Sequence, residues 1–568
     1  MTTATIPSPA VGWFQQHQPL LERALASIRS REYYSAYPEV PSGKIYGENA
    51  QADGKAAFDR RLGKRFELAQ PGTTDWIGAE RSPFGLPLQV TYPKPSLDQL
   101  LAAARQAQRS WGAASADARV GVCLEILKRI NASSFEMALA TQFTTGQAFM
   151  MAFQAGGPHA QDRGLEAVAY ALEAMRTVPP FAMWEKPQKN APLRVEKRYR
   201  IVPRGIGLIV ASSTFPNWNS YPALFADLAT GNAAIVKPHP NAILPLAITV
   251  EIARAVLAES GFDPNIVTLA ADTPDAPIAK DLAVRAEIGL VDFTGSSAFG
   301  TWLEQNAKNA IVFTEKAGVN AVVIDSTDDL QGLARNLAMS VSLYSGQMCT
   351  APQNIFVPRD GIKAGSAHAS FDDVAAAITK AIEGLLSAPE RAVEVLGAIA
   401  SDATLSRIEE QNKKPGVLLS AKELAHPQFP QARVRTPIVA RLDASERERY
   451  ENELFGPIAF IVATDSTEQS LELAAQGAQR CGAITALLYS TDPAVVARAE
   501  DFAAESGASL AINFTGPLLV NQSAAFSDFH VSGANPAGNA SLTDPAFVVN
   551  RFRVTQTRTV LPEPTTAG

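Results

Sequence analysis

Short apolar runs alternate with longer amphipathic stretches along most of the chain after residue 201. The first series of apolar runs lies at residues 206–212, 233–238, 266–270, 290–295 and 320–325. Helical spacing of apolar residues fills the gaps, most clearly over 243–260 and from about residue 296. Runs of this length are typical of strands buried on both faces, and the stretches between them are typical of crossover helices. The pattern predicts βαβ units and a parallel, doubly wound sheet.

A second series of the same kind extends to about residue 513. Its apolar runs lie at residues 354–357, 459–464 and 484–490. Because each series can form its own sheet covered by helices, the chain is expected to fold into two α/β lobes with a cleft between them.

The first 90 residues have a different pattern. Trp13, Leu21 and Ile28 lie at helical spacings and predict a short amphipathic helix, and a loop rich in Pro and Gly follows at 37–43. Helical periodicity begins again at Ser96, which is placed as an N-cap. Residues 1–90 are therefore interpreted as an N-terminal extension.

Composition narrows the class of protein. The 568 residues carry a net charge of −7 at pH 7 without Lys/Arg-rich runs, which argues against nucleic acid or a membrane surface as the main partner. No signal peptide and no apolar stretch long enough to span a bilayer is visible in the sequence. Three widely separated cysteines form neither a disulfide framework nor a metal motif, so a cytoplasmic protein without a metal site is expected.

Two residues are candidates for covalent chemistry. Cys349, in SLYSGQMCTAP, follows small residues that permit close backbone approach, and a thiolate there could act as a nucleophile. A buried structural thiol is the alternative, as is expected for Cys123 and Cys481. Glu315 lies between a predicted strand and a turn, where it could accept a proton from a thiol or water.

Three further segments have features of nucleotide contacts. Lys237 ends an apolar run and so lies at the carboxyl edge of the predicted sheet. Gly295 and Ser296 join a predicted strand to a helix N-terminus, where free N–H groups favour phosphate. Glu453 and Phe455, in the turn ENELFGP, could hold a ribose hydroxyl and pack against a planar ring. No GxGxxG fingerprint is present.

Taken in order, these motifs resemble the aldehyde dehydrogenase superfamily over about residues 90–555. The motifs are Phe215-Pro216, Gly231-Asn232 with Val236-Lys237-Pro238, Phe293-Thr294-Gly295-Ser296, Glu315 with Gly318, Gly346-Gln347-Met348-Cys349, and Glu453-Leu454-Phe455-Gly456-Pro457. Glu315 and Cys349 are 34 positions apart, as in that superfamily.

The resemblance implies a fold, a reaction and a set of roles. The expected fold is two doubly wound α/β lobes plus an oligomerisation hairpin and tail: a cofactor domain at 91–315 with the hairpin near 190–203, a catalytic domain at 316–513, and a tail at 514–568. The expected assembly is a homodimer or homotetramer.

The resemblance also implies oxidation of an aldehyde to a carboxylic acid through a thiohemiacetal and a thioester. Cys349 is then the nucleophile, Glu315 activates the hydrolytic water, and Thr214 helps to hold the oxyanion. The residues implied in binding the nicotinamide cofactor are Ser212, Lys237, Gly295, Ser296, Glu453 and Phe455.

Three positions depart from the superfamily pattern. Thr214 stands where an Asn usually helps to hold the oxyanion, so one amide donor is replaced by a hydroxyl. No acid follows Lys237 in the stretch with His239 and Pro240, so NADP is expected as cofactor, with NAD possible. Residues 526–533 match the usual C-terminal motif only in part.

Within the superfamily, the long N-terminal segment and the variants SSTFPNWNSYPALF and TEKAGVNAVV are similar to a phenylacetic acid degradation subgroup. That similarity implies a ring-opened, CoA-linked semialdehyde as substrate. Two alternatives remain: a CoA-acylating or general aldehyde dehydrogenase, although Glu315 favours hydrolysis, and a non-catalytic relative that has kept the fold.

Overall fold

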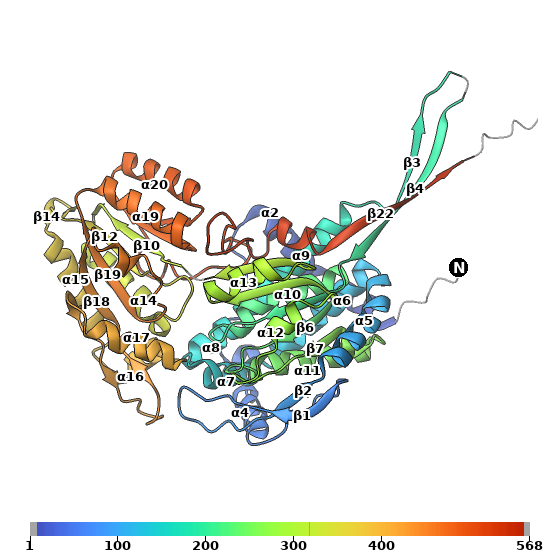
Figure 1. Ribbon diagram of the computed structural model, residues 1–568, viewed down its shortest axis with the longest axis horizontal. Helices are drawn as coiled ribbons and strands as arrows, with labels where there is room; N and C mark the ends of the chain where they lie inside the picture. Colours follow the sequence, from blue (N-terminus) through green and yellow to red (C-terminus); the bar gives the residue numbers. More distant parts are fainter. Residues whose placement is uncertain (1–7, 190, 317, 562–568) are drawn as a thin grey trace, which may run out of the picture.

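The computed structural model describes residues 8–189, 191–316 and 318–561, which form two α/β lobes lying side by side (Figure 1). One lobe contains a five-stranded sheet and the other a seven-stranded sheet. Each strand predicted from an apolar run is present, with ends within two residues of the predicted ones. The predicted doubly wound α/β architecture is confirmed.

The five-stranded sheet is parallel throughout, in the order β7-β6-β5-β8-β9. Its strands are β5 (Ile206–Val210), β6 (Ala233–Lys237), β7 (Val267–Leu269), β8 (Ile288–Gly295) and β9 (Ile311–Lys316). The helices between them are α10 (Pro216–Thr230), α11 (Leu244–Glu259), η1 (Pro264–Ile266), α12 (Ala279–Ala283) and α13 (Ser297–Asn306). The strand order reverses at β5, so a crevice is expected beyond the carboxyl ends of β5 and β8.

The seven-stranded sheet has the order β15-β18-β19-β12-β10-β20-β21, and only the edge strand β15 runs antiparallel to its neighbour among the described pairs. Its strands are β10 (Ala321–Ile324), β12 (Asn354–Pro358), β15 (Val417–Leu419), β18 (Ile438–Asp443), β19 (Ile458–Thr464), β20 (Thr485–Tyr489) and β21 (Ser509–Ile512). The helices of this lobe are α14 (Leu330–Ser342), η2 (Leu343–Gly346), α15 (Phe371–Leu385), α16 (Pro389–Leu396), α17 (Asp402–Asn412), α18 (Arg447–Tyr450), α19 (Thr467–Cys481) and α20 (Pro493–Ser506). Small sheets pair β11 (Ser326–Thr327) with β13 (Ile362–Ala364) and β14 (Ala367–Ala369), and β16 (Glu423–Leu424) with β17 (Val434–Arg435).

The N-terminal region packs against the five-stranded lobe. Its elements are α1 (Ser8–Gln16), α2 (Gln18–Ser30), α3 (Gly43–Tyr46), α4 (Ala50–Arg61), β1 (Thr73–Ile77), β2 (Tyr92–Pro95), α5 (Leu97–Ala113), α6 (Ala116–Ala132), α7 (Ser134–Thr145), α8 (Phe149–Gly156) and α9 (Pro158–Arg176). The prediction of a single helix over Trp13–Ile28 is wrong, because α1 ends before His17 and α2 begins after it. His17 Nε2 lies 3.0 Å from Glu125 Oε2, and Pro19 lies in the first turn of α2. No helix of the described residues is both long and apolar enough to cross a bilayer.

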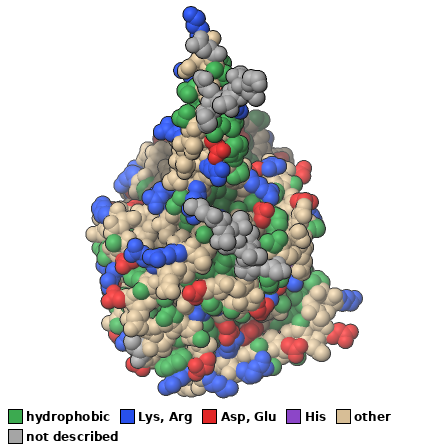
Figure 2. Space-filling view, turned by 90° about the vertical axis from the view of Figure 1, so that its right-hand side faces the viewer, with side chains coloured by type: hydrophobic (Ala, Val, Ile, Leu, Met, Phe, Trp, Pro, Cys, Tyr) green, Lys and Arg blue, Asp and Glu red, His purple; other side chains and the backbone are tan. Residues whose placement is uncertain are grey.

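A three-stranded antiparallel sheet projects from the five-stranded lobe (Figure 1). It consists of β3 (Phe181–Lys186), β4 (Leu193–Pro203) and β22 (Phe552–Val560), with β4 in the middle. The predicted hairpin near 190–203 falls on β4, except that residue 190 lies outside the described residues. Figure 2 views the molecule from this side and shows hydrophobic side chains along the projection.

The C-terminal segment returns from the seven-stranded lobe to the five-stranded lobe. Between β21 and α21 (Pro545–Val549), it lies against the edge strand β9: the Thr314 N–H donates to Asn539 Oδ1 (2.8 Å), and the Asn539 amide donates to Val312 O (2.8 Å). Arg551 then enters the core, where its guanidinium pairs with Asp227 (2.7 Å) and with Asp292 (2.6 and 2.9 Å). These contacts fasten the tail to the lobe.

Replacing Arg551 by Met is expected to destabilise the protein strongly, because two buried carboxylates lose their cation. Removing one partner of a buried ion pair costs about 3–5 kcal/mol. The urea unfolding midpoint of Arg551→Met should therefore fall well below that of the wild type. Arg553→Met, on the exposed face of β22, is the matched control and should leave the midpoint nearly unchanged. Equal midpoints for both variants would contradict this role of Arg551.

Candidate active site

One cavity of about 770 Å³ lies at the carboxyl ends of β5, β6 and β8 and is closed by residues of the seven-stranded lobe. Its volume is within the range of about 300–1,000 Å³ that is usual for ligand sites. All nine residues singled out from the sequence line it. They are Ser212, Thr214, Lys237, Gly295, Ser296, Glu315, Cys349, Glu453 and Phe455. The structure thus brings these side chains together, while the role of each remains a prediction.

Cys349 follows a turn with unusual backbone geometry. Tyr344, Ser345 and Gly346 have consecutive positive φ angles of 52°, 50° and 60°, a conformation that is strained for residues with side chains. The hydroxyls of Tyr344 and Ser345 donate to backbone carbonyls at 2.5 and 3.0 Å, which holds the turn. A Cβ atom at Gly346 would lie 2.5 Å from the carbonyl oxygen of Gly456, so only glycine fits there.

Asn320 fixes the peptide of the candidate nucleophile. Its Nδ2 donates to the carbonyl oxygens of Cys349 (2.8 Å) and Ala351 (3.0 Å). Its Oδ1 accepts from the N–H groups of Ile484 and Thr485 at the start of β20. This buried amide ties the Cys349 loop to the seven-stranded sheet and so fixes the position of the thiol.

Glu315 lies near the end of β9 and is buried, with 1% of its surface exposed. Its Oε1 lies 3.0 Å from His530 Nε2, and its Oε2 accepts from the Asn219 amide at 3.2 Å. Burial acts to raise the pKa of Glu315, but His530, the Cys349 thiol and Asn219 together outweigh burial and hold that pKa below its ordinary value. Glu315 is therefore a carboxylate at neutral pH.

The surroundings of Cys349 disfavour its charged form, unlike those of Glu315. Burial, followed by the negative charge of Glu315, raises the pKa of the Cys349 thiol well above its ordinary value. A nucleophilic thiolate consequently requires a nearby group that takes the proton or stabilises the anion. Donor and acceptor atoms of Glu315, Cys349 and His530 all lie within 4.8 Å of one another.

Two polar residues at or near the start of α10 form a chain of hydrogen bonds to Glu315. The hydroxyl of Ser212, a predicted cofactor contact, donates to Asn219 Oδ1 (3.1 Å) and accepts from the Phe215 N–H (3.3 Å). Asn219, which sequence reasoning missed, connects Ser212 to Glu315. The only sequence signal for Asn219 is a polar residue in the first turn of a helix beside the predicted site. The carbonyl of Thr214 accepts from the Gln147 amide at 2.7 Å, and this bond holds the turn.

At the other end of the cavity, Lys237 is paired with an acid that the sequence argument did not include. Lys237 Nζ lies 2.8 Å from Asp272 Oδ1, which follows β7 and is buried. Burial lowers the pKa of Lys237, and Asp272 partly opposes that shift. Burial and the charge of Lys237 lower the pKa of His239 to about 4, so His239 adds no positive charge at neutral pH.

Glu453 and Phe455 lie in the expected turn on the opposite wall. Burial raises the pKa of Glu453 to about 7, and Arg407 of α17 opposes that shift. The Arg407 guanidinium also donates to the carbonyl oxygen of Phe455, which fixes the turn. Across the cavity, Ser296 occupies the N-cap position of α13, where backbone N–H groups favour an anion.

The cavity therefore combines a thiol and a carboxylate with a lysine and a helix N-terminus that can bind an anion. A model of the aldehyde dehydrogenase family matches residues 91–535, which is most of the chain. The chain belongs to the aldehyde dehydrogenase family. It is accordingly an oxidoreductase that acts on aldehydes with NAD or NADP.

Individual relatives add detail. A crystal structure described as an NAD-dependent aldehyde dehydrogenase from Burkholderia multivorans is 57% identical, covers 99% of this chain and 100% of its own, and has a TM-score of 0.96. The N-succinylglutamate 5-semialdehyde dehydrogenase of Burkholderia lata is 27% identical over 72% of this chain and 79% of its own length. A 1-pyrroline-5-carboxylate dehydrogenase from Thermus with bound NAD, 18% identical over 93% of this chain and 99% of its own, has a TM-score of 0.72 and shows the shared fold.

Cofactor binding is expected to weaken in acid because Glu453 gains a proton as the pH falls through about 7. A protonated carboxyl is a poorer acceptor for ribose hydroxyls, so the Kd for NAD should rise about tenfold between about pH 8 and pH 6. Glu453→Gln should bind NAD more weakly, and its Kd should hardly change over this range. Isothermal titration calorimetry measures both, with Glu448→Gln on the exposed face of α18 as control. An unchanged pH dependence in Glu453→Gln would assign the effect to another group.

Proposed function

We propose that Cys349 and Glu315 carry out the oxidation of a semialdehyde to a carboxylic acid by way of an enzyme thioester. The observation that carries this proposal is the shared cavity: the thiol, the carboxylate, Lys237 and Ser296 all line it. The strand β6, which ends at Lys237, is separated from β9, which carries Glu315, by β5 and β8. Binding at the Lys237 end would leave the reactive end of a nicotinamide cofactor beside Cys349. When bound, the cofactor supplies the hydride acceptor.

The first half of the reaction uses the thiol. Cys349 Sγ attacks the aldehyde carbon, and the carbonyl oxygen becomes an oxyanion in a thiohemiacetal. The backbone N–H of Cys349 and the hydroxyl of Thr214 are the proposed donors to that oxyanion. Loss of one such donor typically costs about 10²–10³ in rate. We therefore expect the Thr214 hydroxyl to provide part of the oxyanion stabilisation that an Asn amide provides at this position elsewhere in the family.

The second half uses the carboxylate. Once hydride has left the carbon, Cys349 carries a thioester, and Glu315 takes a proton from the water that attacks it. Asn219 holds one carboxylate oxygen of Glu315 at 3.2 Å, which orients the group. The presence of this base favours hydrolysis over transfer of the acyl group to CoA.

Single-turnover kinetics test these roles. In Glu315→Gln, the first turnover should release reduced cofactor in a burst, and the steady-state rate should then fall by about 10²–10⁴, the usual contribution of a general base. Cys349→Ala should show no burst while still binding NAD. A Glu315→Gln variant without a burst would place Glu315 before hydride transfer, and turnover in Cys349→Ala would remove Cys349 from the mechanism.

For the cofactor, we propose that both NAD and NADP are accepted and that Asp272 favours NAD. The expectation of NADP depended on the missing acid after Lys237, whereas Asp272 supplies a carboxylate 2.8 Å from Lys237 Nζ. A 2′-phosphate about 4 Å from a carboxylate meets a repulsion of roughly 1–4 kcal/mol at effective dielectrics of 80 to 20. Asp272 also neutralises the cation that would otherwise attract this phosphate.

Asp272→Asn should therefore shift the ratio of kcat/KM for NADP over NAD upward by about tenfold or more. Asparagine keeps an oxygen that can accept from the Ile278 N–H, as Asp272 Oδ2 does at 3.1 Å. Asp275→Asn, exposed on the same loop, is the matched control. An unchanged ratio in Asp272→Asn would show that another group selects the cofactor.

The substrate proposal rests on two different similarities. The N-terminal segment and the SSTFPNWNSYPALF variant favour the phenylacetic acid degradation protein PaaN and a ring-opened, CoA-linked semialdehyde. The Burkholderia relatives named for N-succinylglutamate 5-semialdehyde favour a smaller, carboxylated semialdehyde. A comparison of kcat/KM for both substrates, and for a simple aliphatic aldehyde, distinguishes them.

We further propose a homodimer or homotetramer that assembles through the projecting sheet, in the cytoplasm. Its exposed apolar side chains support this assembly. They are Phe181, Met183, Trp184, Leu193, Val554 and Val560. Large apolar side chains exposed together on a projection are typical of a protein–protein interface. Sedimentation analysis of the purified chain gives the oligomeric state.

A further inference from the structure

His530 contacts both Glu315 and Cys349, although it is not among the residues that line the cavity. It belongs to the C-terminal segment between β21 and α21, and its carbonyl accepts from the Leu542 N–H at 3.0 Å. Only 4% of its surface is exposed. The sequence indicated only that this segment departs from the usual motif, so nothing in the pattern assigned a role to the imidazole.

A single nitrogen of His530 faces both reacting side chains. Its Nε2 lies 3.0 Å from Glu315 Oε1 and 3.9 Å from Cys349 Sγ. The 3.0 Å contact with a carboxylate corresponds to the state in which Nε2 carries a proton, because two acceptors at this distance would repel each other. The sulfur then faces an N–H donor, which suits a thiolate better than a thiol.

The surroundings hold the imidazole in this position. The Trp218 ring of α10 meets the His530 ring edge-on, at 4.6 Å between centroids and 75° between planes. The buried guanidinium of Arg163 lies over the Trp218 ring, 5.2 Å from its centroid. The charged and titratable groups around His530 are thus Glu315 of β9, Cys349 after η2, and Arg163 of α9, which contacts the same indole.

Arg163 also anchors the segment that carries His530. Its guanidinium donates to Ser523 Oγ (2.6 Å), to Asp528 O (2.9 Å) and to Glu166 Oε2 (2.9 Å). The hydroxyl of Thr543 donates to the same Glu166 oxygen at 2.7 Å. Both ends of the segment around His530 are therefore fastened to α9.

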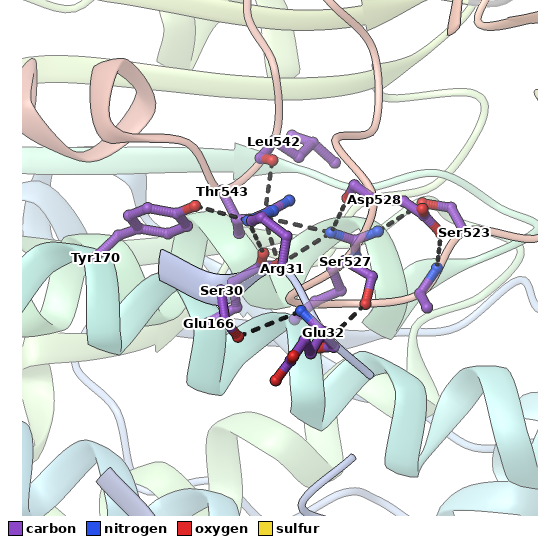
Figure 3. Close-up of polar contacts among 12 residues, drawn as sticks. Ser30, Arg31, Glu32, Glu166, Tyr170, Ser523, Ser527, Asp528, Leu542 and Thr543 are labelled. Atoms are coloured by element: carbon purple, nitrogen blue, oxygen red, sulfur yellow. Dashed lines mark hydrogen bonds and ion pairs between the residues drawn. The ribbon is translucent and has the colours of Figure 1, made fainter. Parts of the chain in front are cut away.

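The N-terminal extension also contacts the segment that carries His530. Arg31 donates to the hydroxyl of Tyr170 at 2.7 Å, and Ser527 donates to the carbonyl of Glu32 at 3.3 Å (Figure 3). Arg31 also stacks over the ring of Phe529, next to His530, at 4.0 Å. An imidazole held from both sides can keep one geometry through a reaction cycle.

We propose that His530 is a further catalytic residue, which takes the proton of the Cys349 thiol and holds the resulting thiolate and the Glu315 carboxylate through one N–H. In this step the ring starts neutral, with its proton on Nδ1; the S–H bond breaks, the proton forms an Nε2–H bond, and the electron pair of the broken bond remains on sulfur, so the ring becomes an imidazolium between two anions. This inference rests on the proposed function in that Cys349 is the nucleophile. It explains how a buried thiol beside a carboxylate becomes reactive.

Alkylation of Cys349 tests the proposal without substrate or cofactor, so its outcome is independent of the proposed reaction. The rate of iodoacetamide modification, followed by peptide mass spectrometry against pH, reports the thiolate at Cys349 alone. In His530→Gln, the amide can still donate to Glu315 but cannot take a proton. The midpoint of the pH profile should rise by about one unit or more, and the rate at neutral pH should fall about tenfold or more.

His17→Gln is the matched control, because His17 forms a similar buried pair, 3.0 Å from Glu125, far from the cavity. It should leave the alkylation profile of Cys349 unchanged. A second variant, His530→Asn, and a second measurement, the ultraviolet absorbance of the thiolate titrated with pH, repeat the comparison independently. A midpoint that is higher in the His530 variants than in the wild type supports the proposal; an unchanged midpoint in a folded His530 variant overturns it.

Discussion

Buried guanidinium groups fasten the C-terminal segment of the chain to the five-stranded lobe, and the geometry of the site depends on them. Arg551 neutralises Asp227 and Asp292 in the core. Arg163 and its partner Glu166 bind the two ends of the segment that carries His530. Burying these charges is tolerated because each has oppositely charged or carbonyl partners. Between these anchors the segment lies against β9, so Glu315 receives its imidazole partner from more than two hundred residues further along the chain.

Parallel strands explain why the remaining side chains meet at one cavity. Lys237, Gly295 and Glu315 all lie at or near the carboxyl ends of their strands, and such ends face the same edge of a sheet. Cys349 and Glu453 reach that edge from the other lobe on turns held by side-chain hydrogen bonds. The left-handed turn before Cys349 is held by the hydrogen bonds of the Tyr344 and Ser345 hydroxyls and by the close contact of Gly346 with the Gly456 carbonyl.

Periodicity and motif order were sufficient to predict eight of the sheet strands, the two lobes and nine of the residues that line the cavity, because these are encoded in local sequence. The break at His17 was missed although Pro19 marks a helix start locally; what holds His17 at the break is a tertiary contact with Glu125, which no local pattern shows. His530, Asp272 and Asn219 were missed for the same reason. The role of each depends on a partner that is distant in sequence, and no local pattern predicts such pairs. The acid beside Lys237 comes from a different loop than the one where the family pattern places it.

The Arg551 cluster also bears on the order in which the chain can fold. Its ion pairs join residues 324 and 259 positions apart, and closing such long loops costs conformational entropy before any contact repays it. Until Arg551 and β22 have left the ribosome, the five-stranded lobe contains two acids in its core without their cation, and its projecting sheet lacks a strand. The nascent lobe is therefore an incomplete folding unit until these residues have been synthesised.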